Sequence, residues 1–156
     1  MNAYEATTPS EGAMLIRELM SGGVITVHRE TPVVEARDLM ARERIRHLPV
    51  TDIGGAVLGM VTDRDIRLNL PSQATTLSVW EINHLLTKLT VEEVMSKPVI
   101  TVMPDRPARD AARLMLDHKI GALPVLDDGH LIGILTETDI VRAFFHMTTP
   151  MPLGRH

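Results

Sequence analysis

The chain has 156 residues, with 16 Lys and Arg against 20 Asp and Glu, a formal charge of −4, and no cysteine. The missing cysteine excludes disulfides, thiolate nucleophiles and sulfur-ligated zinc sites. The acidic balance lacks the basic footprint of a nucleic-acid-binding domain. Because the first dozen residues are polar and the apolar runs are far shorter than the ~20 residues that span a bilayer, we expect a soluble, cytoplasmic protein without membrane contact.

One pattern occurs twice along the chain. Met20-Ser21 and the β-branched run 24–27 recur 75 positions later, as Met95-Ser96 and the run 99–102. After the turn at 52–55 the offset falls to 74, which is a one-residue change where insertions are best tolerated. The sequence therefore predicts an internal repeat.

Each copy reads as strand, helix, strand, strand and helix. In the first copy we expect a strand at 24–27 and a helix with Thr31 at the N-cap and Pro32 at its first position. A hairpin of 48–51 and 57–61 and a helix ending near Leu70 follow. The second copy repeats this order from the strand 99–102, through a helix at Arg106-Pro107 and a hairpin turn at Asp128-Gly129, to a helix ending near Phe145.

The segment between the copies carries a helix of its own. Ser78 and Glu81 form a capping-box pattern, and apolar residues follow at helical spacing. A second capping pattern, Thr90 to Glu93, opens the second copy. The helix carries the one tryptophan, Trp80, and needs a surface to cover, on this module's flank or on another subunit. The predicted organisation is a polar tail (1–13), repeat 1 (14–70), a helical linker (71–89), repeat 2 (90–146) and a C-terminal tail (147–156).

Each hairpin carries the same motif. Leu48-Pro49-Val50 precedes Gly59-x-x-Thr62-x-x-Asp65, and Leu123-Pro124-Val125 precedes Gly133-Ile134-Leu135-Thr136-x-x-Asp139. This doubled pattern resembles the CBS domain, named after cystathionine β-synthase, and the whole chain resembles the stand-alone bacterial pairs related to acetoin utilisation. The resemblance implies an α+β fold of two β-α-β-β-α repeats packed with pseudo-two-fold symmetry, known as a Bateman module. It also implies two clefts for adenosine-containing ligands, namely AMP, ADP, ATP or S-adenosylmethionine, and signalling to a regulated partner protein.

Two interpretations of the Thr-Asp pair stay open. An ionised carboxylate can accept hydrogen bonds from two neighbouring ribose hydroxyls, and a strand-to-helix junction offers a hydroxyl and backbone N–H groups to a phosphate. The alternative is plain capping, in which Thr is the N-cap and the acid binds first-turn N–H groups. The family assigns the motif Asp to ribose and the motif Thr to ribose or phosphate.

By the same resemblance, each cleft combines one motif with wall residues of the opposite repeat. The first cleft takes Thr62, Arg64 and Asp65 with Val99, Ile100, Ile120, Gly121 and Ala122. The second takes Ile134, Thr136 and Asp139 with Val24, Ile25, Ile45, Arg46 and His47. Arg64 and Arg46 are each candidates for a phosphate, or else solvated surface residues. Because Gly121 and Ala122 are small, the Asp65 cleft is expected to be the more permissive.

Three further expectations concern function. The seven histidines lack metal-ligand spacing and no catalytic motif accompanies them, so neither a metal site nor an enzyme is expected. Apolar helical faces around Leu39-Met40 and Leu114-Met115, with Val141 and Phe144-Phe145 nearby, predict a homodimer. The alternative functions are a structural homodimerisation module with empty clefts and an enzyme acting on nucleotides.

Overall fold

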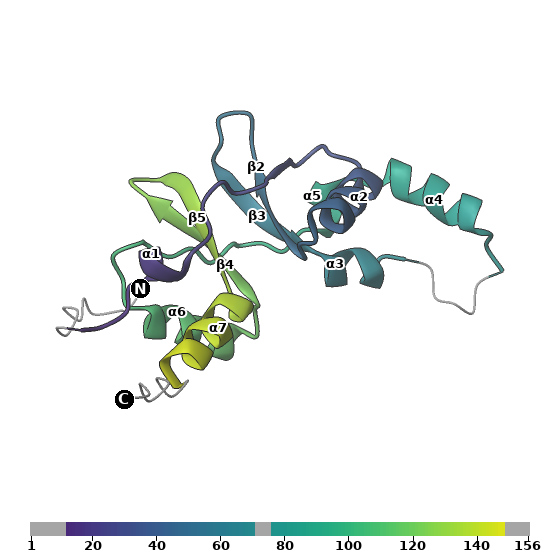
Figure 1. The fold of residues 1–156 in the computed structure, drawn as a ribbon. Coiled ribbons are helices and arrows are strands. Elements are labelled where there is room, and N and C mark those ends of the chain that lie inside the picture. The colour runs from purple at the N-terminus through teal and green to yellow at the C-terminus, as the bar shows by residue number, and fades with distance from the viewer. Residues whose placement is uncertain (1–11, 71–75, 149–156) are drawn as a thin grey trace. The chain divides into compact units, whose positions relative to one another are not determined.

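The computed structural model describes residues 12–70 and 76–148 and has the mixed α+β fold expected from the sequence (Figure 1). It divides into two compact units. The first-repeat unit contains residues 24–70, 76–100 and 129–131, and the second-repeat unit contains 12–23, 101–128 and 132–148.

The sheet of the first-repeat unit has the order β1-β2-β3. It consists of β1 (Val27–His28), β2 (His47–Thr51) and β3 (Val57–Thr62). Val27 pairs with Val50 in parallel, and β2 and β3 form the predicted antiparallel hairpin with Leu48 opposite Val61. The predicted strand at 24–27 is shorter than expected, because only its last residue enters the ladder.

The hairpin of β4 (Ala122–Asp127) and β5 (His130–Thr136) belongs to the second-repeat unit, except for residues 129–131. Asp128 and Gly129 form its two-residue turn, with φ of 48° and 76°, the left-handed values that such a turn requires. The predicted strand at 99–102 is reduced to a single parallel bridge between Val102 and Val125, the equivalent of Val27 with Val50. The copies therefore share their pairing but not the length of the first strand.

The predicted helix starts at Thr31-Pro32 and Arg106-Pro107 are wrong by one residue. The helices are α2 (Val33–Glu43) and α6 (Ala108–His118), and the prolines themselves are the N-caps, without a side-chain cap. The first helical N–H groups are satisfied from outside the helix instead, since Val33 donates to the Leu89 carbonyl and Ala108 to the Met14 carbonyl, at 2.8 Å each. The helices after the hairpins, α3 (Asp63–Leu68) and α7 (Glu137–Thr148), end near the predicted positions.

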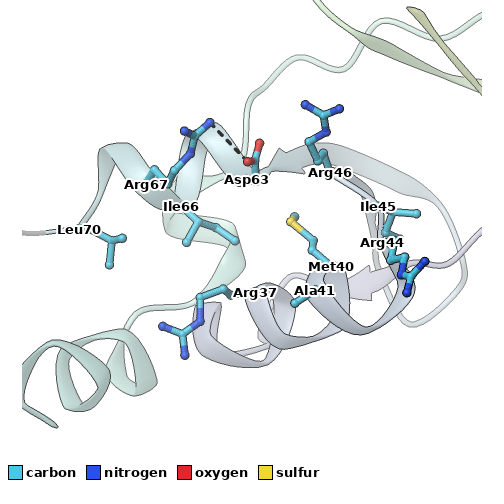
Figure 2. Close-up of a pocket in the computed structure, with 10 residues that line it drawn as sticks. All are labelled: Arg37, Met40, Ala41, Arg44, Ile45, Arg46, Asp63, Ile66, Arg67 and Leu70. Atoms are coloured by element: carbon cyan, nitrogen blue, oxygen red, sulfur yellow. Dashed lines mark ion pairs between the residues drawn. The ribbon is translucent and has the colours of Figure 1, made fainter. Parts of the chain in front are cut away.

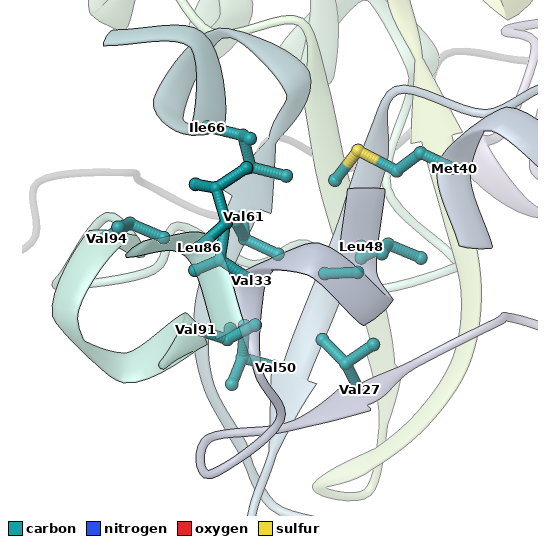
Figure 3. Close-up of a cluster of buried hydrophobic side chains, with 11 residues drawn as sticks. Val27, Val33, Met40, Leu48, Val50, Val61, Ile66, Leu86, Val91 and Val94 are labelled. Atoms are coloured by element: carbon teal, nitrogen blue, oxygen red, sulfur yellow. The ribbon is translucent and has the colours of Figure 1, made fainter. Parts of the chain in front are cut away.

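Both capping boxes in the connecting segment are confirmed. Ser78 caps α4 (Val79–Lys88), and Thr90 precedes α5 (Val91–Val94). Helix α4 packs against α2 (Figure 1). Its Leu86 is buried in the core of the first-repeat unit with Val33, Val61 and Ile66 (Figure 3). The linker helix therefore covers the flank of its own unit, while Trp80 stays 73% exposed.

One premise of the predicted dimer is corrected by the core. Met40 of α2 and Met115 of α6 are only 5% and 7% exposed, so they pack inside their own units. On the helices that this prediction used, the exposed large apolar side chains are instead Val141, Phe144, Phe145 and Met147 of α7 and Leu116 of α6.

Each unit is completed by a segment that adjoins the other repeat in the sequence. In the first-repeat unit, Ser96 bridges to Met60 of β3. In the second-repeat unit, Ser21 bridges to Ile134 of β5, and α1 (Ile16–Leu19) lies against α6 and α7. The compact units thus do not follow the chain order of the two repeats, and the domain limits 14–70 and 90–146 stay a prediction about the sequence.

Candidate functional site

The first motif lies where β3 ends and α3 begins. One carboxylate oxygen of Asp65, Oδ2, accepts from the Thr62 N–H at 2.9 Å and from the Thr62 hydroxyl at 3.0 Å. In return, the Asp65 N–H donates to the Thr62 hydroxyl oxygen at 3.1 Å. This reciprocal pair starts the helix, so the capping interpretation of the motif is confirmed.

The second motif repeats this geometry between β5 and α7. Asp139 Oδ2 accepts from the Thr136 N–H at 2.8 Å and from its hydroxyl at 2.9 Å, and the Asp139 N–H donates back at 3.3 Å. Asp139 is one of two buried polar residues among those described, at 9% exposure, and its Oδ1 lies 3.4 Å from Nη1 of Arg142. The first motif has no such arginine, since the described hydrogen bonds to the Asp65 side chain all use Oδ2.

The capping hydrogen bonds from the threonines use only one oxygen of each carboxylate. In each motif Oδ2 is committed to the helix start, and Oδ1 can accept further donors, although Oδ1 of Asp139 already lies 3.4 Å from Arg142 Nη1. A carboxylate held in place by its own backbone is a fixed, charged acceptor, and hydrogen bonds to such a group are about twice as strong as neutral ones. The geometry is therefore compatible with binding a hydroxyl-bearing ligand as well as with capping.

A pocket of about 470 Å³ opens between α2 and α3 (Figure 2). Met40 and Ile66 lie in its middle, and arginine side chains stand around the rim (Figure 2). Its lining is Arg37, Met40, Ala41, Arg44, Ile45, Arg46, Asp63, Ile66, Arg67 and Leu70. The lining contains four arginines and one carboxylate, Asp63, which is paired with Arg67 at 3.3 Å. The rim is therefore cationic.

Two of the predicted wall residues, Ile45 and Arg46, line this pocket, whereas Thr62, Arg64 and Asp65 do not. Sequence reasoning missed Arg37, Arg44 and Arg67. Arg44 had a readable signal, because the repeat offset of 75 pairs it with another basic residue, Lys119. In the structure both residues follow a helix and have a left-handed backbone. Arg46 and Arg64 are exposed, and neither side chain has an ion pair or hydrogen bond among the residues that the structure describes.

The remaining predicted contacts divide between the units. Val99 and Ile100 lie in the same unit as Thr62 and Asp65, whereas Ile120, Gly121 and Ala122 lie in the other. Val24, Ile25, Ile45, Arg46 and His47 lie in the first-repeat unit, and Ile134, Thr136 and Asp139 in the second. The crosswise pairing of motifs and walls stays a prediction.

Within residues 12–70 and 76–148, no group of three or more His, Asp and Glu side chains is placed to hold a metal ion. His84 stacks on Trp80, with ring centroids 5.5 Å apart and planes 4° apart. No helix in the described part of the chain is long and apolar enough to span a bilayer.

Comparison with known proteins decides the family. The sequence-family model of the CBS domain matches residues 16–72 and 91–146. This chain belongs to the CBS domain family. The CBS pair resembles, at 31% identity, a CBS domain-containing protein of Dictyostelium discoideum, over 89% of this chain and 97% of that protein. It is 32% identical to an L-aspartate semialdehyde sulfurtransferase of Methanocaldococcus jannaschii, but covers only 23% of that enzyme's length.

Three solved structures are similar over most of the CBS pair. The CBS domain pair of protein MJ0100, in complex with 5′-methylthioadenosine and S-adenosyl-L-methionine, has a TM-score of 0.73 at 30% identity and covers 87% of this chain and 99% of that one. CBSX2 in complex with AMP has a TM-score of 0.69 at 30% identity, with 86% and 98% covered. A putative acetoin utilization protein (AcuB) of Vibrio cholerae has a TM-score of 0.70 at 29% identity, with 86% and 93% covered, in agreement with the predicted subtype.

Proposed function

We propose that this CBS pair is a regulatory module that binds an adenosine-containing ligand and signals its presence to a partner protein. The observation that carries the proposal is the doubled motif, in which Asp65 and Asp139 are each held by a threonine through one carboxylate oxygen. The second oxygen suits a ribose hydroxyl. Support comes from the similar pairs that were solved with AMP and with 5′-methylthioadenosine and S-adenosylmethionine.

The cations favour a phosphorylated ligand in part of the site. Arg46 and Arg64 are exposed guanidinium groups without a described partner, and a guanidinium can bind a phosphate through two parallel hydrogen bonds. The proposal includes the two crosswise clefts, a cytoplasmic location and the absence of catalysis.

Isothermal titration calorimetry with AMP, ATP, 5′-methylthioadenosine and S-adenosylmethionine tests this function. We expect saturable binding of at least one compound, and its loss in the double variant Asp65→Asn, Asp139→Asn. Asn keeps the size of each side chain and removes the charge, so unchanged heat in the double variant would contradict the assignment of ribose binding to these carboxylates.

A second candidate function rests on a different observation. Four apolar side chains of α7 are each more than 60% exposed, namely Val141, Phe144, Phe145 and Met147. Contiguous exposed apolar surface marks an interaction site. We propose that this α7 face is buried in a homodimer. If no adenosine compound binds while the dimer forms, the chain acts as a structural homodimerisation module.

A further inference from the structure

The two motif carboxylates differ in one contact. In both motifs Oδ2 is occupied by the threonine N–H and hydroxyl, so Oδ1 is the oxygen left for a ligand. Arg142, one turn further along α7, places Nη1 at 3.4 Å from Oδ1 of Asp139. In the first motif no described donor reaches Oδ1 of Asp65.

The repeat explains the difference at the level of sequence. With the offset of 74 that aligns Asp65 with Asp139, the position of Arg142 corresponds to Leu68. Leu68 lies at the end of α3, is 71% exposed and carries no donor in its side chain. A single position, three residues after the motif aspartate, therefore decides whether the ligand-facing oxygen already has a partner.

The two side chains of the Arg142–Asp139 pair differ in burial, and this difference affects ligand binding. The Asp139 side chain is 10% exposed, whereas that of Arg142 is 62% exposed. A ribose hydroxyl that binds Oδ1 of Asp139 has to share this oxygen with the Arg142 guanidinium or displace the guanidinium from it. A neutral hydroxyl is a weaker hydrogen-bond donor to a carboxylate than a guanidinium is. Only the arginine of this pair lies mostly in water, so displacing Arg142 costs about as much as the stronger exposed ion pairs contribute.

From this asymmetry we infer that Arg142 is a specificity-determining residue which competes with ribose hydroxyls for Oδ1 of Asp139. The motif at Asp65 is then the stronger ribose acceptor and fills first, and the motif at Asp139 fills at higher ligand concentration. This inference rests on the proposed function, because it assigns a rank to the two predicted ribose contacts.

The test isolates each motif and then exchanges the deciding residue. Asp65→Asn leaves the Asp139 motif as the charged acceptor, and Asp139→Asn leaves the Asp65 motif. The probe is 5′-methylthioadenosine, which has ribose hydroxyls but no phosphate, so that loss of an arginine does not also remove a phosphate contact. Calorimetry compares Asp65→Asn with and without Arg142→Leu, and Asp139→Asn with and without Leu68→Arg.

We expect Arg142→Leu to tighten binding at the Asp139 motif about two- to five-fold, the upper part of the range that exposed ion pairs contribute. Leu68→Arg should weaken binding at the Asp65 motif by a similar factor. The 2′-deoxy analogue of the probe should respond less to either exchange, a readout that a merely structural role of Arg142 would not produce. Arg113→Leu is the matched control, because Arg113 is an exposed arginine paired with Asp117 on α6 and should leave both affinities unchanged.

Two outcomes would overturn the inference while leaving the proposed function standing: unchanged affinity in both exchanges, or weaker binding after Arg142→Leu, which would make Arg142 a ligand contact. Absence of any binding to the unaltered chain and to both single Asp variants, for AMP as well as for the probe, would overturn the proposed function and the inference together.

Discussion

Gly59 of β3 lies directly against Met95, the residue that follows α5. A Cβ built on Gly59 would lie 2.8 Å from Met95 Sδ and 2.8 Å from the Ser96 carbonyl oxygen. Gly133 has the same relationship to Met20, with a Cβ at 2.5 Å from Sδ, but there the Ser21 carbonyl is 3.2 Å away. The motif glycine is therefore a packing requirement, since it lets a Met-Ser segment pair with the second strand of the hairpin.

This contact predicts unequal effects for two alanine variants. Gly59→Ala meets a backbone oxygen that cannot move alone, so we expect it to destabilise the fold by about 1–3 kcal/mol, as overpacking does. Gly133→Ala meets mainly the flexible end of a methionine and should cost less. Urea unfolding measures both. Gly22→Ala is the control, because its Cβ would have no neighbour closer than 4.0 Å, and an equally large loss there would refute the packing argument.

The linker helix supplies a second prediction. Leu86 is 1% exposed and packs in the core, whereas its neighbour Leu85 is 47% exposed. Leu86→Ala should lower the free energy of unfolding by about 2–5 kcal/mol, as a buried leucine truncation does. Leu85→Ala should change it by less than about 0.5 kcal/mol. Equal effects of the two variants in urea would show that α4 does not pack on this unit as described.

Sequence reasoning was most accurate where a local pattern determines the structure. The capping boxes at Ser78 and Thr90, the Asp128-Gly129 turn and the hairpins depend on neighbouring residues, and each lies where predicted. The start of α2 depended on a distant residue instead. Its first N–H is satisfied by the Leu89 carbonyl, so Thr31 is not needed as a cap.

The candidate site was predictable only in part, because some of its features depend on packing and contacts that a local pattern does not determine. The motifs identified Thr62, Asp65, Thr136 and Asp139, and the structure brings each pair together. Periodicity placed Met40 and Met115 on an apolar face, but periodicity alone does not decide whether such a face packs in the core or against a second copy of the chain. The Arg142–Asp139 contact is an i,i+3 pair that could have been read from the sequence, but its meaning required the knowledge that Oδ2 is already occupied.

The Thr90–Glu93 contact predicts a pH dependence. Hydrogen bonds from the Thr90 N–H and hydroxyl lower the pKa of Glu93 below its usual value of 4.5. A carboxyl with a lowered folded-state pKa stabilises the fold above its unfolded pKa, and this stabilisation is lost as the pH falls through the folded-state pKa. Urea midpoints of the unaltered chain should therefore fall more steeply below pH 4.5 than those of Glu93→Gln. Parallel curves for the two proteins would contradict the effect.

Ligand binding should also appear as thermal stabilisation. A compound with an affinity of about 10 μM, present at about 1 mM, stabilises the folded state by about 2.7 kcal/mol, provided that it does not bind the unfolded chain. For a chain of this length the melting temperature then rises by several degrees. The rise should shrink in Asp65→Asn and again in the double variant with Asp139→Asn. A shift that is identical in all three proteins would place the binding site elsewhere.

The exposed face of α7 predicts the assembly. Phe144 and Phe145 are 67% and 63% exposed, and burying two aromatic side chains contributes several kcal/mol to association. Light scattering should give twice the chain mass at micromolar concentration, and Phe144→Glu should shift the distribution toward the monomer because it would bury a carboxylate in an apolar contact. The control is Trp80→Glu, which alters a 73% exposed aromatic residue on α4 and should leave the dimer intact. If Trp80→Glu dissociates the dimer and Phe144→Glu does not, the linker helix and not α7 forms the interface.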